Sequence, residues 1–215
     1  FIQKQEAQFK RLGILGDWEH AYKTKDPAYE AEVLRVFARF VRKDLVYRSK
    51  KPVYWSIPCK TALAEAEIEY KPHTSQSIWV KFPIVGPNKL NLKNAYAIIW
   101  TTTPWTLPAN RAIAVSPTLT YVLLEVEGEQ FLVAQGLAEK FADDCGIKNI
   151  KFGSTFLGSE LEGLITQHPF IQRQSPIVLA DYVNLESGTG CVHTAPGHGN
   201  EDYLTGLKYN LEIDC

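Results

Sequence analysis

The segment between residues 77 and 134 alternates short apolar runs with turn-forming residues. The runs are rich in β-branched and aromatic side chains, and proline, glycine or asparagine stands between them, which is typical of β-strands. They occupy residues 77–82, 96–100, 112–115, 121–126 and 130–134. Residues 127–129 predict a hairpin turn, and residues 137–142 predict one helix. Strands of this length and spacing predict an α+β, mostly β fold, which is a barrel or a sandwich with short inserted helices.

The first 49 residues have a helical pattern instead. Asp26 followed by Pro27 is typical of a helix start, with an N-cap residue and then proline at the first helical position. Apolar residues then recur every three or four positions from Tyr29 to Val41, which predicts an amphipathic helix with solvated basic faces. We therefore divide the chain into a helical segment, residues 1–49, and a β-rich domain, residues 50–215.

Residues 51–70 connect these two parts. Residues 51–55 are strand-like. Residues 61–70 have helical propensity, but Glu65, Glu67 and Glu69 alternate with apolar residues, and alternation is the period of a strand. We predict a strand that carries the three acids on one exposed face, rather than a catalytic pair of carboxylates.

A polar stretch at residues 100–111 interrupts the β-rich part. Buried hydroxyls without partners are costly, so this composition suits a pocket wall better than a core strand. The other interpretation is that β-branched threonines merely favour a strand. The residues that we predict to line a pocket are Thr101, Thr102, Thr103, Trp105, Thr106 and Asn110.

A second polar stretch, residues 188–203, is rich in glycine and contains His193, His198 and Asp202. A helix is expected to begin at residues 200–202, where an acid also stabilises the helix dipole. The two histidines and Asp202 would make three metal ligands. However, proline and glycine stand between them in place of the rigid helical spacing of metal hydrolases, so we predict no metal.

Together the two stretches resemble the signature segments of the editing domain of isoleucyl-tRNA synthetase, a class I aminoacyl-tRNA synthetase. Valyl and leucyl relatives usually place arginine after the paired threonines, whereas Thr103 stands here, and residues 193–199 also have the isoleucyl form. The resemblance implies that residues 50–215 are a barrel-like editing domain, truncated at its C-terminal end. It also implies that residues 1–49 belong to the catalytic body, with a strand and turn at residues 12–18.

The resemblance further implies a role for each polar residue. Asp202 would be catalytic and would pair with the α-ammonium of the misattached amino acid. His193 would shape a pocket floor that admits valine and excludes isoleucine. Trp105 and Asn110 would bind substrate, although Asn110 is better suited to bracing the loop. Four catalytic threonines would bind the terminal adenosine of tRNA and position the water or the reacting carbonyl: Thr101, Thr102, Thr103 and Thr106.

The implied reaction is post-transfer editing, the hydrolysis of valyl-tRNA(Ile) to valine and free tRNA. This ester needs a positioned water and support for the oxyanion, so we expect no cofactor, whereas the full-length synthetase is expected to use ATP and Mg. The partners would be the tRNA(Ile) 3′ end and valine, in the cytoplasm or in an organelle. A noncatalytic insert that docks the tRNA acceptor end and a metal-dependent hydrolase remain alternatives.

Composition and missing motifs exclude other classes. The 215 residues carry a net charge of −1, which does not suit a general nucleic-acid binder. No apolar run approaches the roughly 18 residues of a membrane span, and the polar start predicts no signal peptide. A GxSxG elbow and a P-loop are absent from the sequence. Ser56 stands where a CxxC pair with Cys59 would begin, so we predict no zinc there.

Overall fold

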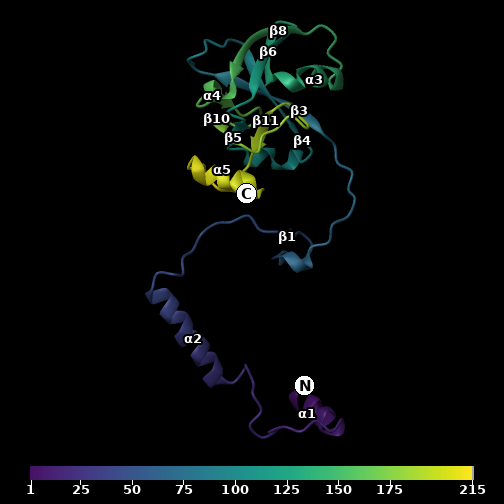
Figure 1. Ribbon diagram of the computed structural model, residues 1–215, viewed down its shortest axis with the longest axis vertical. Helices are drawn as coiled ribbons and strands as arrows, with labels where there is room; N and C mark the ends of the chain where they lie inside the picture. The colour runs from purple at the N-terminus through teal and green to yellow at the C-terminus, as the bar shows by residue number, and fades with distance from the viewer. Residues whose placement is uncertain (215) are drawn as a thin grey trace. The chain divides into compact units, whose positions relative to one another are not determined.

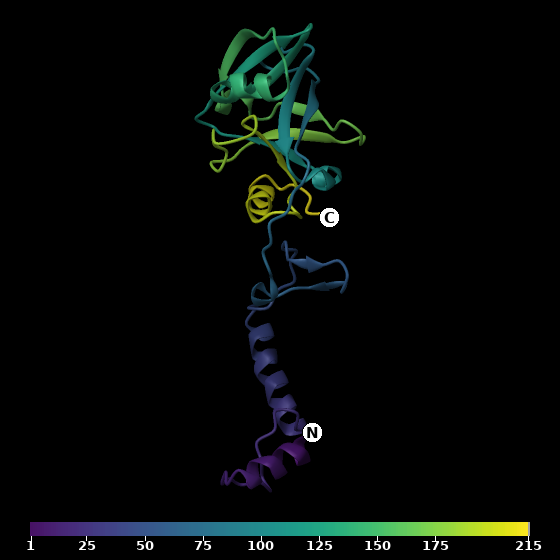
Figure 2. The same ribbon diagram turned by 90° about the vertical axis from the view of Figure 1, so that its right-hand side faces the viewer.

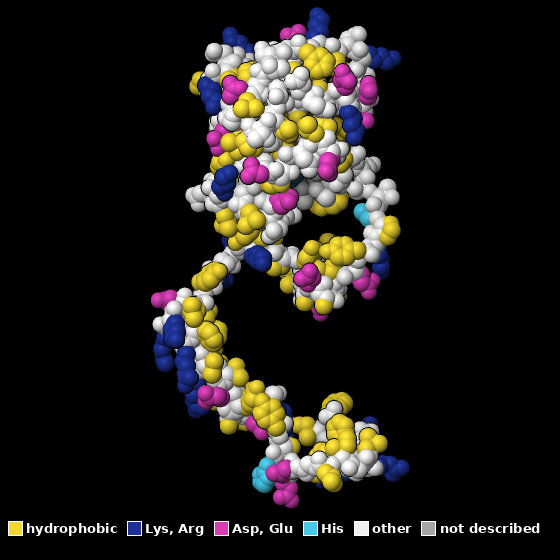
Figure 3. All heavy atoms as spheres, in the orientation of Figure 1, with side chains coloured by type: hydrophobic (Ala, Val, Ile, Leu, Met, Phe, Trp, Pro, Cys, Tyr) yellow, Lys and Arg dark blue, Asp and Glu magenta, His cyan; other side chains and the backbone are white. Residues whose placement is uncertain are grey.

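The computed structural model describes residues 1–214, which fall into two compact units that divide after Ser49. The first unit contains α1 (Ile2–Arg11) and α2 (Pro27–Arg42) (Figure 1). The start of α2 confirms the prediction, with Asp26 as N-cap and Pro27 in the first turn. Basic side chains follow one side of α2 and apolar side chains another (Figure 3), so this unit exposes an apolar stripe that includes Phe37 and Phe40.

The strand predicted within residues 12–18 is wrong. The backbone N–H groups of Leu12, Gly13 and Ile14 donate to carbonyls of α1 and close the end of that helix. Gly13 has a φ of +76°, which ends the helix in a turn. The first half of the segment is therefore the C-terminal turn of α1, and its backbone donors are not available to a strand ladder.

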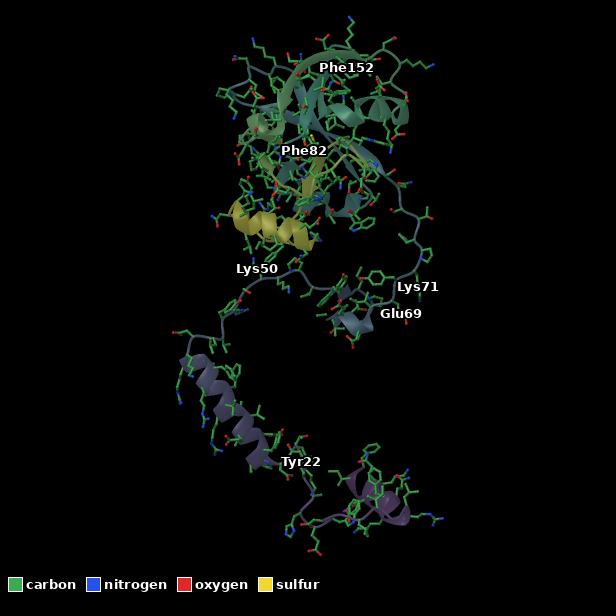
Figure 4. The ribbon with its side chains drawn as sticks, viewed as in Figure 1. Tyr22, Lys50, Glu69, Lys71, Phe82 and Phe152 are labelled. Atoms are coloured by element: carbon green, nitrogen blue, oxygen red, sulfur yellow. The ribbon has the colours of Figure 1, made fainter. Side chains whose placement is uncertain are left out.

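The second unit begins with a small antiparallel pair, β1 (Trp55–Ser56) and β2 (Thr61–Ala62), followed by the 3₁₀ turn η1 (Glu65–Glu67). The strand predicted over residues 61–70 is thus largely wrong. The Glu67 carboxylate accepts from the Ala64 backbone N–H at 2.8 Å, and this local bond favours a turn over an extended chain. Glu69 and Lys71 form an exposed ion pair beyond the turn (Figure 4).

The body of the second unit is a mixed sheet (Figure 2). Its nine strands follow the order β11-β5-β10-β9-β3-β4-β7-β6-β8. The five strands predicted between residues 77 and 134, the hairpin turn among them and the helix that follows are confirmed. The sheet contains β3 (Ile78–Val85), β4 (Ala95–Thr101), β5 (Ala112–Val115), β6 (Thr120–Val126), β7 (Glu129–Ala134), β8 (Lys151–Leu157), β9 (Ile165–Gln167), β10 (Gln174–Leu179) and β11 (Cys191–Thr194). The helices of this unit are η2 (Pro104–Ala109), η3 (Gln135–Leu137), α3 (Ala138–Asp144), α4 (Gly158–Leu161) and α5 (Asn200–Lys208).

The sheet curls, because the chain entering β11 returns to the strands in the middle of the order. The Ala134 backbone N–H on β7 donates to the Thr189 carbonyl at 2.7 Å, and the Thr189 hydroxyl donates to the Ile98 carbonyl on β4. Along β4, strand alternation divides the apolar side chains between two clusters. Ile99 belongs to the main core with the buried Phe82, which Figure 4 labels, and Ile98 packs on the opposite face. The predicted α+β, mostly β fold is confirmed.

The start of the second unit lies close to the segment that follows α5. The Lys50 ammonium donates to the Ile213 carbonyl at 2.9 Å. Arg111, just before β5, pairs with the carboxylates of Glu212 and Asp214 and holds the segment that follows α5. Within residues 1–214, none of the helices combines the length and the apolar character that crossing a bilayer would require.

Candidate functional site

A cavity of about 500 Å³ lies between the end of β4 and the start of α5. It brings together the two polar stretches of the sequence, since Thr106 and His193 are in hydrogen-bond contact although 87 positions separate them. Seven of the eight predicted site residues line this cavity: Thr101, Thr102, Thr103, Trp105, Thr106, His193 and Asp202.

One wall, the threonine wall, is the turn that leaves β4 and carries Thr101, Thr102, Thr103 and Thr106. Pro104 is the first residue of η2, where its fixed φ suits a helix start. The buried Thr101 hydroxyl accepts from the Thr103 backbone N–H at 3.1 Å, and the Thr106 hydroxyl donates to the Thr103 carbonyl at 2.9 Å. These bonds fix the turn before any ligand binds. Trp105 is 64% exposed, and its indole is free to stack on a planar ring.

The opposite wall is formed by β11 and α5. Asp202 lies in the first turn of α5, where the helix dipole favours negative charge. Its Oδ2 accepts from the Ala195 backbone N–H at 2.9 Å. Burial raises the pKa of Asp202, and the neighbouring charge of Glu201 also acts to raise it, although the Ala195 N–H opposes both. A poorly solvated carboxylate of this kind is strongly stabilised by a cation beside it.

His193, on β11, reaches across to the threonine wall. Its Nε2 is 3.0 Å from the Thr106 hydroxyl, and its Nδ1 is 2.8 Å from the Asn110 side-chain nitrogen. Burial lowers the pKa of His193 to about 4, and the neighbouring His168 and His198 act in the same direction. The imidazole is therefore neutral at pH 7 and fills space without carrying charge.

Asn110 is the predicted site residue that does not line the cavity. It is fully buried, and its side-chain nitrogen is shared between the Ala112 carbonyl, at 2.8 Å, and His193. The imidazole of His193 engages the amide from the cavity side, and the direct contact of Asn110 with substrate stays a prediction. The alternative role, bracing, agrees with this geometry.

A third side of the cavity was not predicted. It is formed by Tyr182, Val183, Asn184 and Ser187. Burial raises the pKa of Tyr182, and the charge of Asp202 adds to the effect, so the phenol stays neutral. These residues belong to an irregular loop without a motif, and their place in the cavity depends on the curl of the sheet. The one available signal was their position directly before the glycine-rich stretch.

The donors near the cavity do not match a metal centre. Among residues 1–214, no three His, Cys, Asp or Glu side chains are grouped so that they could hold a metal ion. Both nitrogens of His193 are engaged by side chains, which leaves neither for a metal. At the other candidate position, the Ser56 hydroxyl accepts from the Cys59 backbone N–H at 3.3 Å.

The arrangement suits a ligand with a cation at one end and hydrogen-bonding groups at the other. Asp202 supplies the negative charge, the threonines supply hydroxyls, and His193 supplies a neutral surface between them. Cys191 also lines the cavity, but burial raises the pKa of its thiol to about 12, so it is a poor nucleophile. This chemistry favours the positioning of a water over covalent catalysis by the protein.

Comparisons with known proteins agree with this geometry. Residues 1–188 match the profile of tRNA synthetases class I (I, L, M and V). The chain is 56% identical over 213 residues to an isoleucine–tRNA ligase of Fervidobacterium pennivorans, and 53% identical over 213 residues to one of Petrotoga mobilis. Each alignment covers 99% of this chain and 23% of the relative, so the chain spans about a quarter of the length of these relatives.

Two solved structures share the fold. The structure of GlLeuRS-CP1 superposes with a TM-score of 0.54 and 20% identity, over 63% of this chain and 61% of that one. The editing domain of the P. knowlesi cytosolic leucyl-tRNA synthetase gives a TM-score of 0.53 and 14% identity, over 62% of each chain. With a family profile that matches residues 1–188 and a fold shared with these domains, the chain belongs to the class I tRNA synthetases of the isoleucine, leucine, methionine and valine group.

Proposed function

We propose that this chain is the editing part of an isoleucine–tRNA ligase and hydrolyses the ester of valyl-tRNA(Ile). Water adds to the ester carbonyl, the bond from the carbonyl carbon to the terminal ribose oxygen breaks, and that oxygen takes up the proton. The observation that carries the proposal is the partly buried carboxylate of Asp202, which faces a row of threonine hydroxyls across one cavity. Its natural complement is an aminoacyl ester with a free α-ammonium.

Each wall has a part in this proposal. Asp202 binds the α-ammonium and so orients the amino acid. The hydroxyls of the threonine wall hold the terminal adenosine and the attacking water, and the exposed indole of Trp105 stacks on the base. His193 occupies the space that the extra methylene of isoleucine would need. One methylene in an apolar pocket is worth on the order of 1–3 kcal/mol, for which the isoleucine–valine pair is itself the standard example.

The first prediction concerns Asp202→Asn. The amide keeps the size of the carboxylate and can still accept from the Ala195 N–H, but it lacks the charge that binds the ammonium. We expect kcat/KM for valyl-tRNA(Ile) deacylation to fall on the order of 10²-fold, the loss expected for one hydrogen bond between charged groups. Circular dichroism should show an unchanged fold.

The matched control is Glu201→Gln, in the same helical turn. Glu201 is exposed and does not line the cavity, so this variant removes the same charge from the start of α5 without touching the site. Equal losses in both variants would contradict the assigned role of Asp202. The wild type is also assayed with a chelator. Inhibition would indicate a metal-dependent hydrolase, and binding of the tRNA acceptor end without turnover would indicate a docking insert.

A further inference from the structure

Ser175 is a fully buried hydroxyl on β10 that does not line the cavity but is linked to it. Its Oγ donates to the Asn110 side-chain oxygen at 2.6 Å. The carbonyl of Ser175 in turn accepts from the Thr166 hydroxyl on β9 at 2.7 Å, which fixes the strand at this position. Ser175 therefore gives the buried Asn110 oxygen a partner, and a buried acceptor without one is costly.

The direction of the Asn110 amide follows from its neighbours. The Ala112 carbonyl can accept but cannot donate, so the atom 2.8 Å from it is the amide nitrogen, and the amide oxygen then faces Ser175. The same nitrogen lies 2.8 Å from His193 Nδ1. An amide nitrogen can only donate, so Nδ1 is the acceptor in this pair and carries no proton.

The tautomer of His193 is thereby determined. A neutral imidazole with an unprotonated Nδ1 carries its proton on Nε2, which is 3.0 Å from the Thr106 hydroxyl oxygen. The Thr106 hydroxyl donates its own hydrogen bond to the Thr103 carbonyl at 2.9 Å. All donors thus run in one direction, from Ser175 through Asn110 and His193 to Thr106.

We infer that Ser175 is a positioning residue that anchors this chain, so that Thr106 presents an acceptor, and not a donor, to the cavity. The Thr103 hydroxyl lies 3.5 Å from the Thr106 oxygen but closer, at 3.2 Å, to the Thr101 hydroxyl, to which it can donate instead. The remaining lone pair of Thr106 is then available to a water or a ribose hydroxyl that donates to it. His193 cannot take a proton from that water, because Nε2 is already protonated and Nδ1 is engaged by Asn110. The effect of this arrangement on substrate choice rests on the proposed function, whereas the tautomer does not.

The test combines nitrogen NMR with kinetics on the full 215-residue chain labelled with ¹⁵N-histidine. The chain contains five histidines, and a His193→Gln sample identifies the His193 signals. We expect Nδ1 of the wild type to resonate as an unprotonated nitrogen and Nε2 as a protonated one at pH 7. In Ser175→Ala, the Asn110 oxygen loses its partner. The amide is then held by the Ala112 carbonyl alone and leaves Nδ1 in part of the molecules. In that part we expect an Nδ1-protonated population, together with a roughly tenfold loss of preference for valyl over isoleucyl ester.

Ser116→Ala is the matched control. Ser116 is also a buried serine, but its hydroxyl contacts Thr118, away from this chain of bonds. The control should leave both the His193 signals and the ester preference unchanged. A protonated Nδ1 in the wild type would overturn the inference, as would His193 signals and a preference in Ser175→Ala that match those of the control. If the wild type hydrolyses neither ester, the proposed function fails, and the nitrogen signals alone decide the role of Ser175.

Discussion

Burial disfavours the charged form of each of the two titratable groups that face each other across the cavity, His193 and Asp202, with opposite consequences for the two. It lowers the pKa of His193 and raises that of Asp202. Both nitrogens of the neutral imidazole are hydrogen-bonded to side chains, so the imidazole needs no further partner from a ligand. The carboxylate stays charged at a cost in solvation, which an incoming cation relieves. The cavity therefore favours a ligand whose ammonium binds beside α5, next to Asp202.

The low pKa of His193 makes the fold sensitive to acid. Because its folded pKa of about 4 lies below the ordinary 6.5, the unfolded chain binds a proton first as the pH falls. The contribution of the neutral imidazole is present above about pH 6.5 and is lost between 6.5 and 4. We expect the free energy of unfolding to fall by roughly 2 kcal/mol between pH 7 and pH 5 from this residue.

Urea unfolding at the two pH values measures this loss. His193→Gln cannot titrate at this position and should show a smaller loss between pH 7 and pH 5. His73→Gln, an exposed histidine outside the cavity, should behave as the wild type does. If the loss is the same in all three proteins, the imidazole of His193 does not titrate as its burial requires.

Among single residues, the sequence allowed us to predict those site residues that lie close together in the chain. The threonines, and His193 with Asp202, stand within short polar stretches, and composition alone makes such stretches conspicuous. Ser175 and Tyr182 have no such context. Ser175 meets Asn110 across 65 positions, through the pairing of β10 with β5, and no local pattern encodes that contact. The contact between Ser175 and Asn110 could therefore be recognised only from the folded structure.

Among the elements, the strands that sequence reasoning found are those with buried apolar runs. β4 and β5 are buried along most of their length, and their β-branched runs are conspicuous. The last four strands were not predicted, for physical reasons. β8 is largely exposed, β9 has three residues, and β10 contains a proline, which weakens the strand pattern. β11 was read as part of a polar site, because its histidine and threonine masked a buried strand.

The turn into β11 leaves no room for a side chain. Gly190 has a φ of +76°, and a Cβ placed there would lie 2.3 Å from the Cβ of Ala134. Its carbonyl also accepts from the Tyr121 hydroxyl at 2.7 Å, so the backbone cannot easily move aside. We expect Gly190→Ala to destabilise the fold by roughly 2–5 kcal/mol, from backbone strain and overpacking together.

Thermal or urea unfolding tests this prediction, with Gly128→Ala as the control. Gly128, in the hairpin between β6 and β7, also has a positive φ, of +84°, but no atom lies within 4 Å of its Cβ position. The control therefore carries the backbone strain without the contact. A loss in Gly190→Ala no larger than in Gly128→Ala would mean that the approach to Ala134 is not the limiting contact.

For the molecule as a whole, charge limits the affinity for nucleic acid. With 23 basic and 24 acidic residues, the chain has little general attraction for phosphates. We expect the isolated chain to bind whole tRNA with a dissociation constant on the order of micromolar or weaker at physiological salt, and with a shallow salt dependence. Fluorescence anisotropy across a salt series measures both. Nanomolar binding at physiological salt would show that a local phosphate site outweighs the overall charge.

The hydrogen bond from Lys50 to Ile213 joins two positions that lie 163 residues apart in the chain. The sheet between them must be folded for these two residues to meet. A pair of spectroscopic labels at residues 50 and 213 would therefore report the folding of the second unit as one change in distance.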